Sequence, residues 1–557
     1  MRILSLIKDR LINIKLKDLI ILVFLGSVFL SSENFVNKEN TVKFYFTVFS
    51  FLFITLYLVF LKNEKIKIVL KEITSFSILK GFYVVGVLQS LYAICQYLGW
   101  FTTNNHFFPI TGSFDNPAGF SAVLSMLLPI GVIWCLKSKK LERYLLTLSL
   151  GLMCFSIVAS GSRAGVLAVI VSTIFVFISE FQLISKIKNS KKTKAFVTVF
   201  IVLLVIVLIG LYKLKLNSAN GRLLIWKVST EMIKDKPLIG FGYNGFKAHY
   251  MDYQAKYFKQ NPKSQYSQLA DNVSHPFNEF IKIIVNYGAL GLLTTFVVIF
   301  FFFKRILRLD PFKRNLFLGI LVSFFVFSFF SYPLHYTPVW FLLIYSTLIV
   351  VLGKTPKKVF SKKTKAIIGA ICFAGIVFFS FSMYLELKWK KIATKSLQGQ
   401  TEQMQPEYKH MYPYLKYNVL FLYNYGAELN YIEQYNESIT LLDECKQQFN
   451  DYDVQMLLAD NYYNIGNTKM AIKTYEYAEQ MIPCRFLPLY KQFEIYQKEK
   501  KTLKAKEIAE KIIKKEVKVK SSAVELMITE AQNYLSLEKP ESSETSEYKG
   551  RVYGNEK

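Results

Sequence analysis

Long apolar runs separated by short polar segments dominate the first two-thirds of this chain. Runs of this length and composition are typical of helices that cross a bilayer, and they predict about eleven spans. The predicted spans are Leu19–Leu30, Phe44–Leu61, Phe76–Leu98, Ala118–Leu136, Tyr144–Ala159, Ala164–Ile184, Ala195–Tyr212, Phe277–Phe303, Leu316–Phe330, Val339–Leu352 and Ala366–Met383.

One long polar segment, residues 214–275, interrupts these runs. A connection of this length is usually functional. From about Leu387 the pattern becomes that of soluble helices. The stretch from Ala459 to Pro483, with small residues at 459, 471 and 478, matches the tetratricopeptide helix–turn–helix unit of about 34 residues, and weaker copies flank it. These repeats are expected either to cap the protein structurally or to bind a partner, and to fold separately from the membrane part.

The sequence therefore predicts an all-α protein, a polytopic membrane helix bundle joined to a soluble helical repeat domain. Residues 1–386 form the membrane domain with its outward loop 214–275, residues 387–537 form the repeats, and residues 538–557 form a disordered tail, because that tail lacks apolar residues.

Charge defines the orientation. Lysine and arginine gather in alternate loops, which by the positive-inside rule places the N-terminus in the cytoplasm and the 214–275 loop and C-terminal part outside. The formal net charge is +29 and 52% of residues are hydrophobic. Because the basic residues lie in short clusters beside apolar runs, they indicate a membrane surface, and nucleic-acid binding is not expected.

Cysteine and histidine patterns give no sign of a metal site. The six cysteines and five histidines show no metal-ligand spacing, and the outward loops carry no paired acidic motif. Four cysteines lie in apolar runs, where they act as packing residues. A bridge between Cys445 and Cys484 remains open. We therefore expect a chemistry that needs neither metal nor cofactor.

Two arginines are predicted at the outer membrane face, Arg163 at the start of one span and Arg222 at the start of an amphipathic stretch with Trp226. Paired guanidinium groups suit a diphosphate, since their planar donors match phosphate oxygens. The alternatives are an arginine that snorkels to the interface and an interfacial aromatic belt.

His275 and Asn278 stand where the chain re-enters the membrane. A histidine suits general-base work on a sugar hydroxyl, and the alternative is a helix-start histidine bonded to backbone. The text from Gly240 to Gly245 reads GxGxxG, but a helical pattern precedes it where a dinucleotide fold needs a strand. We interpret it as a flexible turn whose backbone approaches a ligand.

Four segments, in order, resemble the O-antigen ligase/polymerase family of bacterial membrane glycosyltransferases. They are Thr111-Gly-Ser-Phe-Asp-Asn-Pro117, Ser160–Gly165, the block from Gly221-Arg222-x-x-x-Trp226 to Pro237-Leu-Ile-Gly-Phe-Gly242, and His275-Pro-Phe-Asn278 followed by Tyr287–Gly291. Two positions depart from the pattern: Phe277 replaces a histidine that often precedes the asparagine, and Ala118 replaces the last asparagine of NPN.

This resemblance implies transfer of a glycan from a polyprenyl diphosphate on the outer face of the bacterial inner membrane. It implies His275 and Arg222 as catalytic residues and Arg163, Trp226, Asn278 and Asn116 as substrate-binding residues. The acceptor would be lipid A core in an O-antigen ligase, a growing chain in a polymerase, or a protein in an oligosaccharyltransferase. A flippase or exporter scaffold is the non-enzymatic alternative, but polar groups at mid-membrane, typical of transporters, are not evident.

Overall fold

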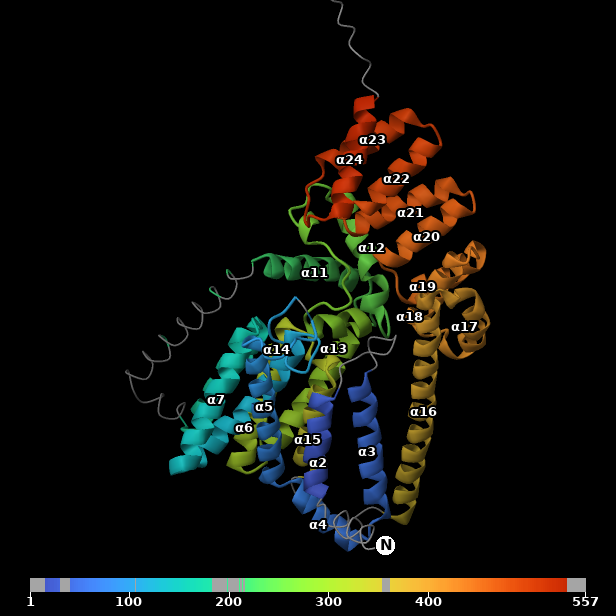
Figure 1. The fold of residues 1–557 in the computed structure, drawn as a ribbon. Coiled ribbons are helices and arrows are strands. Elements are labelled where there is room, and N and C mark those ends of the chain that lie inside the picture. The colour runs from blue at the N-terminus through green and yellow to red at the C-terminus, as the bar shows by residue number, and fades with distance from the viewer. Residues whose placement is uncertain are drawn as a thin grey trace, which may run out of the picture.

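The computed structural model describes residues 16–30, 41–105, 107–182, 216–352 and 361–537, with residues 198, 210 and 213 (Figure 1). All regular elements in these residues are helical. They are α2 (Leu16–Phe29), α3 (Val42–Phe60), α4 (Asn63–Ile73), α5 (Phe76–Tyr97), α6 (Pro117–Lys137), α7 (Lys140–Ala159), α8 (Arg163–Glu180), α11 (Leu216–Asp235), α12 (Gly245–Gln260), η1 (Ser267–Leu269), α13 (Glu279–Ile306), α14 (Pro311–Phe330), η2 (Pro333–His335), α15 (Thr337–Leu352), α16 (Lys362–Lys395), η3 (Ser396–Gln400), α17 (Thr401–Leu415), α18 (Val419–Tyr431), α19 (Tyr435–Gln448), α20 (Tyr452–Asn464), α21 (Thr468–Met481), α22 (Leu487–Lys498), α23 (Thr502–Lys514) and α24 (Ser522–Leu537).

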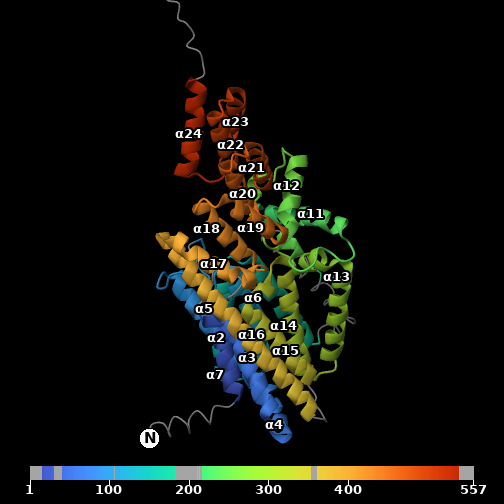
Figure 2. The same ribbon diagram turned by 90° about the vertical axis from the view of Figure 1, so that its right-hand side faces the viewer.

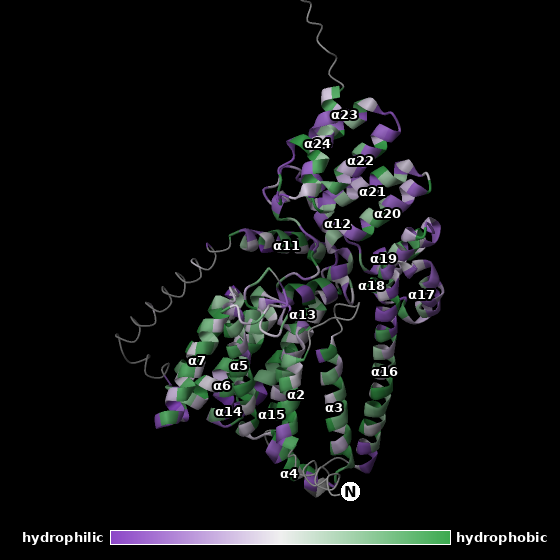
Figure 3. Ribbon diagram, in the orientation of Figure 1, coloured by the Kyte–Doolittle hydropathy of each residue, from purple (hydrophilic) through white to green (hydrophobic). Residues whose placement is uncertain are grey.

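The chain divides into an apolar bundle and a polar helical part stacked on one end of it (Figure 3). Within the described residues, 8 helices are long and apolar enough to cross a membrane, namely α3, α5, α6, α7, α8, α13, α14 and α16. The shorter α2 and α15 coincide with two more predicted spans. The structure thus confirms an all-α membrane protein. The tail 538–557 and, apart from residues 198 and 210, the predicted span Ala195–Tyr212 lie outside the described residues.

Helix α6 forms the centre of the bundle, with 83% of its apolar window buried, against 6% for α16 at the periphery. Small residues explain this position. A Cβ at Gly131 would overlap the ring of Tyr83 on α5, and one at Gly165 on α8 would overlap Ser121 of α6. Small residues let helix backbones approach closely. In lipid the hydrophobic effect does not drive apolar helices together, so their association depends on this close packing.

Helix α16 joins the bundle to the repeats (Figure 2). It packs along α3 and continues without a break to Lys395, past the end of its apolar part. The domain boundary expected at residues 386/387 therefore falls inside a continuous helix. Trp389, on this extension, is fully buried and donates from Nε1 to Asn424 Oδ1 of α18 at 2.8 Å, so the extension belongs to the repeat core.

The helices after α17 pack as successive antiparallel pairs, α18 with α19, α20 with α21, and α22 with α23. The small residues of the repeat pattern lie inside these pairs: Ala459, Ala471 and Ala478 are all fully buried. Gly466, at φ 80°, makes the turn between α20 and α21. This arrangement agrees with the tetratricopeptide interpretation, because the pattern requires small residues where paired helices touch.

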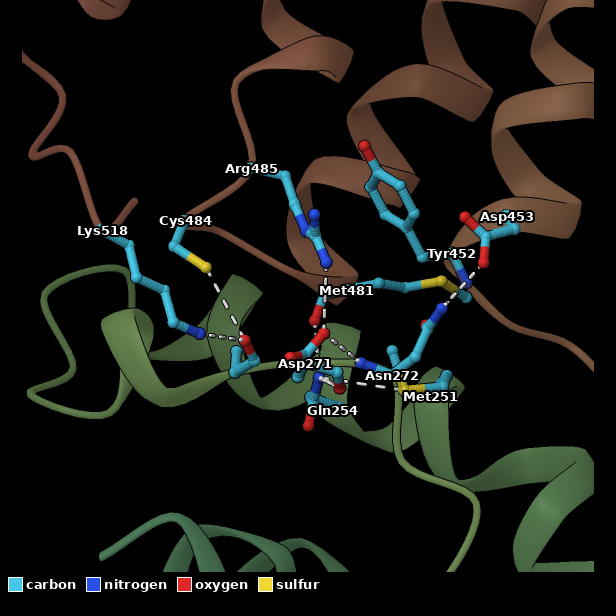
Figure 4. Close-up of polar contacts among 11 residues, drawn as sticks. Met251, Gln254, Asp271, Asn272, Tyr452, Asp453, Met481, Cys484, Arg485 and Lys518 are labelled. Carbon is cyan, nitrogen blue, oxygen red and sulfur yellow. Dashed lines mark hydrogen bonds and ion pairs between the residues drawn. The ribbon is translucent and has the colours of Figure 1, made fainter. Parts of the chain in front are cut away.

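The 214–275 loop and the repeats share one apolar core. Met232 of α11, Tyr250 of α12 and Met481 of α21 are each 0% exposed and belong to a single buried cluster. Polar contacts cross the same interface (Figure 4): Gln254 donates to Met481 O at 2.7 Å, and Asn272 Nδ2 donates to Asp453 at 3.1 Å. Separate folding of the repeats stays a prediction, and part of their core lies against the loop.

Gln254 tests the interface. Its amide Nε2, fully buried, donates both to Met481 O and to Asp271 O at 3.2 Å. Gln254→Ala leaves both carbonyls without this donor, and an unpaired buried polar group costs about 1–3 kcal/mol. We expect the melting temperature of the purified protein to fall measurably, whereas Gln260→Ala at the exposed end of α12 should leave it unchanged. Equal melting temperatures for both variants would contradict an interface that stabilises the fold.

The GxGxxG segment fills a break in α13. Gly288 interrupts that helix at φ 64°, ψ −165°, and the segment bonds to the opened backbone, with Phe241 N donating to Val285 O at 2.9 Å and Ala289 N donating to Pro237 O at 2.8 Å. A Cβ at Gly240 would overlap the backbone of Asn286. The close backbone approach is therefore to α13. The interpretation of Gly240 as part of a ligand-binding turn is therefore wrong. The third and fourth of the four motif segments instead bond to each other through their backbones.

All six cysteines are free. Cys445 is buried within the first repeat pairs and Cys484 within the core shared with the loop, so they belong to different clusters. The bridge that the sequence left open is not formed.

Candidate active site at the loop end of the bundle

Helix α11 lies across the end of the bundle, roughly perpendicular to the spanning helices (Figure 1). This orientation directs two predicted residues toward the turn that precedes α13. The Arg222 guanidinium lies 5.2 Å from the centre of the Phe277 ring, and Trp226 Nε1 donates to Pro276 O at 2.9 Å. Residues from the beginning and the end of the loop, 50 or more positions apart in the sequence, therefore lie in contact.

Arg163 is the first residue of α8, whose N-terminus Ser162 caps by accepting from Gly165 N at 3.3 Å. Its guanidinium donates to Ser218 Oγ of α11 at 3.0 Å. Burial, and then the neighbouring charge of Arg163, lower the pKa of Arg222 to about 10, so Arg222 stays charged at neutral pH. In the described part of the chain Arg222 has no carboxylate partner.

Two like charges held this close repel each other, and an anion between them would relieve the repulsion. The N-terminus of α8 adds the partial positive charge of a helix start at the same point. The α6 start is adjacent, since Ser121 Oγ donates to Ser162 Oγ at 2.6 Å. The arrangement suits an anion with several oxygens.

The turn around His275 has an unusual backbone. Phe277 has φ 53°, a left-handed conformation that bulky side chains rarely adopt. Asn278 follows as the N-cap of α13, where its Oδ1 accepts from Phe280 N and Ile281 N while its Nδ2 donates to Phe329 O at 3.1 Å. Strained residues persist where the surrounding contacts over-determine them, often at functional sites.

The His275 ring stacks on Tyr332, with centroids 4.8 Å apart and planes 18° apart. The His335 ring lies 5.2 Å away. Burial, and then His335, lower the pKa of His275 to about 3, with smaller effects from Lys282 and Lys247. At neutral pH the imidazole is therefore uncharged and carries a lone pair that can accept a proton. Its Nδ1 is buried and has no hydrogen-bond partner among the residues that the structure describes.

Tyr332 joins the remaining residues. Asn116 Nδ2 lies 3.5 Å from the Tyr332 hydroxyl, while Asn116 Oδ1 caps α6 by accepting from Ala118 N at 2.8 Å. The Phe277 ring meets Tyr332 edge-on at 5.3 Å. Burial is the main cause that raises the pKa of Tyr332, and the charge of Arg222 opposes it.

The sequence analysis missed Tyr332 and His335. Both lie in the short connection between α14 and α15, whose position is held by Glu279 Oε1, which accepts from Leu334 N at 3.1 Å. The available signal was a cluster of polar aromatic residues, Tyr332, His335 and Tyr336, in a loop free of lysine and arginine. Nothing local indicated that it lies beside His275.

The six predicted residues thus gather around Tyr332 and the 275–278 turn. Their polar atoms have different hydrogen-bond partners. The polar atoms of Trp226 and Asn278 bond to backbone groups of the protein, and the side chain of Asn116 caps a helix. We therefore propose that these three position the site, while Arg163, Arg222 and His275 remain the candidates for contact with substrate.

A cavity of about 640 Å³ opens beside His275. His275, His335 and Asp115 line it from the bundle, Lys247 from α12, and residues of the first repeat pairs from the opposite side. Lys247 lies over the Phe449 ring at 5.3 Å. Within the described residues, no three His, Cys, Asp or Glu side chains are grouped so as to hold a metal ion.

In a comparison with known protein families, the model of the O-antigen ligase family matches residues 148–296. The match confirms the resemblance seen in the sequence motifs. It contains every predicted site residue except Asn116, and it ends well before the helical repeats. No curated protein and no solved structure matches the chain.

Proposed function

We propose that this protein takes part in polysaccharide assembly and transfers a glycan from a polyprenyl diphosphate to an acceptor hydroxyl. The match of residues 148–296 to the O-antigen ligase family supports this proposal. The observation that carries this proposal is the charged pair Arg163 and Arg222 next to an uncharged His275.

The chemistry follows from these groups. The acceptor oxygen attacks the anomeric carbon of the donor glycan, its proton passes to the imidazole of His275, and the bond to the diphosphate breaks with its electron pair leaving on the phosphate oxygen. Arg222 and Arg163 stabilise that charge, so the leaving group needs no proton. The negative diphosphate also raises the pKa of His275 above about 3, which makes the imidazole a stronger base when the donor is bound.

The distribution of loop charges supports a site on the outer face of the bacterial inner membrane, with a cytoplasmic N-terminus. A donor on that face would be reached from the bilayer, and the end of the bundle that bears α11 and the repeats would face outward. The bundle would align donor and acceptor, which converts an encounter of two molecules into one oriented step.

The acceptor in this proposal is lipid A core, as in an O-antigen ligase, and the alternatives are a growing polymer or a protein. Glycan analysis of a deletion strain separates them. Loss of glycan on lipid A core supports the ligase, loss of chain length supports the polymerase, and loss of glycoprotein supports the oligosaccharyltransferase. Normal glycans on all three would overturn the transfer reaction, and lipid-linked glycan retained on the cytoplasmic side would indicate a flippase.

We propose that the reaction needs no metal ion, because the arginine pair supplies the positive charge that a divalent cation would otherwise provide. Treating the purified protein in vesicles with a chelator should leave the transfer rate unchanged. A rate that falls with chelator and recovers with Mg²⁺ or Mn²⁺ would contradict this part of the proposal.

A further inference from the structure

The wall of the cavity that faces His275 is built by the repeats, outside the region that matches the family. Tyr423 and Asn424 of α18 line it, together with Phe449, Asp451 and Asp453 around the α19–α20 connection. A candidate catalytic histidine and the first repeat pairs therefore line the same cavity. Neither a structural cap nor a docking surface for a separate protein requires this.

We propose that this cavity is the acceptor subsite and that it takes the uncharged, hydroxyl-rich end of a glycan. The inference rests on the proposed glycan transfer and names its acceptor class. In this arrangement the repeats form part of the active site.

The size of the space fits. At about 640 Å³ it lies in the range of roughly 300–1,000 Å³ that is usual for pockets that hold small ligands. Its lining combines aromatic rings, Tyr423 and Phe449, with side chains that hydrogen-bond hydroxyls. Rings pack on the C–H faces of sugars and carboxylates accept from sugar hydroxyls, so this lining suits a sugar better than an apolar ligand.

The charge of the lining selects against a phosphorylated acceptor. Asp115, Asp451 and Asp453 face the cavity, and Lys247 is the one basic lysine or arginine among its lining residues. The formal net charge of the whole chain is +29, so the acidic lining is opposite in sign to the charge of the protein as a whole. Neither Arg163 nor Arg222 is among the residues that line the cavity, and Arg222 lies against the Phe277 ring. The diphosphate and the acceptor are thus drawn to different places, and a phosphate on the acceptor is repelled.

The wall is rigid. Asn424 Oδ1 accepts from Trp389 Nε1 at 2.8 Å and from the Tyr408 hydroxyl at 2.9 Å. Asn272 fixes the other edge, since its Nδ2 donates to Asp453 and its Oδ1 accepts from Tyr452 N at 3.2 Å. A pre-formed wall loses little entropy when an acceptor binds, which favours specific recognition.

Tyr423→Ala tests the wall by kinetics with protein in vesicles. The acceptor probe is a neutral oligosaccharide of the lipid A core, freed of its lipid, and the lipid-linked glycan is the donor. We expect the acceptor KM to rise about tenfold while the donor KM stays within about twofold. Tyr431→Ala, on the same helix but 70% exposed, is the matched control and should change neither. An unchanged acceptor KM in Tyr423→Ala would overturn the inference.

The charge argument has its own test, the double variant Asp451→Asn, Asp453→Asn. Asn keeps the cap that Asp451 provides to α20 and can still accept from Asn272, so the fold is preserved while two charges are removed. The wild type should use the neutral core oligosaccharide in preference to the same oligosaccharide bearing a phosphate monoester. The variant should lose most of that preference, and a preference that stays the same would contradict the acidic selection.

A binding measurement separates this inference from the proposed reaction. Ser274 is exposed and lines the cavity, so Ser274→Cys can be labelled with a maleimide. The core oligosaccharide should protect the label site, even without donor, and the phosphorylated oligosaccharide should not. Transfer without protection would overturn the cavity assignment and leave the reaction standing. Protection without transfer in the wild type would overturn the reaction.

Discussion

Replacing His275 with alanine should abolish glycan transfer while the donor still binds. The imidazole takes the proton of the acceptor hydroxyl, and a general base of this kind contributes roughly 10²–10⁴-fold to the rate. The arginine pair that grips the diphosphate is untouched by the change. We expect the transfer rate to fall by that factor, and the affinity for lipid-linked donor, measured by direct binding, to change by less than about threefold.

The matched control is His410→Ala, a substitution at an exposed histidine of α17 away from the cavity. It should leave the rate unchanged. His335→Ala is a second informative variant, since that ring lies 5.2 Å from His275 and lowers its pKa. Near-normal turnover in His275→Ala would remove it from the mechanism.

Arg222→Lys should reduce transfer by about 10²-fold, close to the loss seen when a group that stabilises a developing oxyanion is removed. The substitution keeps the charge but not the planar fork, and one ammonium cannot bond two phosphate oxygens in the same geometry. It also weakens the contact with the Phe277 ring, 5.2 Å from the guanidinium, which orients the group. The fall should appear in the transfer rate at saturating donor.

Arg485→Lys is the control of the same chemical type. Arg485 pairs with Asp271 at 3.4 Å on an exposed surface, where such pairs contribute little. Arg163→Ala should weaken donor binding as well as rate, because Arg163 shares the diphosphate in this mechanism. If Arg222→Lys transfers at the wild-type rate, the bidentate grip on the diphosphate is wrong.

Several features were determined by the sequence itself, because each depends on neighbours along the chain. Apolar runs of bilayer length predicted the spanning helices, and α5, α6 and α14 begin and end within a few residues of the predicted limits. Small residues at the repeat spacing predicted the α20–α21 pair, where they are buried. The order of four short motifs predicted a resemblance to the O-antigen ligase family, and the family match at residues 148–296, which holds three of the four motifs, confirms that resemblance.

Other features were decided by tertiary structure, because they join residues far apart in the chain. Tyr332 and His335 reach His275 only through the packing of α13 against the α14–α15 connection. In the sequence, Gly240 and Gly288 look like independent turn signals. In the structure, Gly288 breaks α13 and the segment around Gly240 bonds to the backbone at that break. The repeats form a wall of the cavity because Gln254, Asn272 and the shared core hold them on the loop. No local pattern encodes such contacts, since each residue's preference is satisfied equally well in many arrangements until the helices pack.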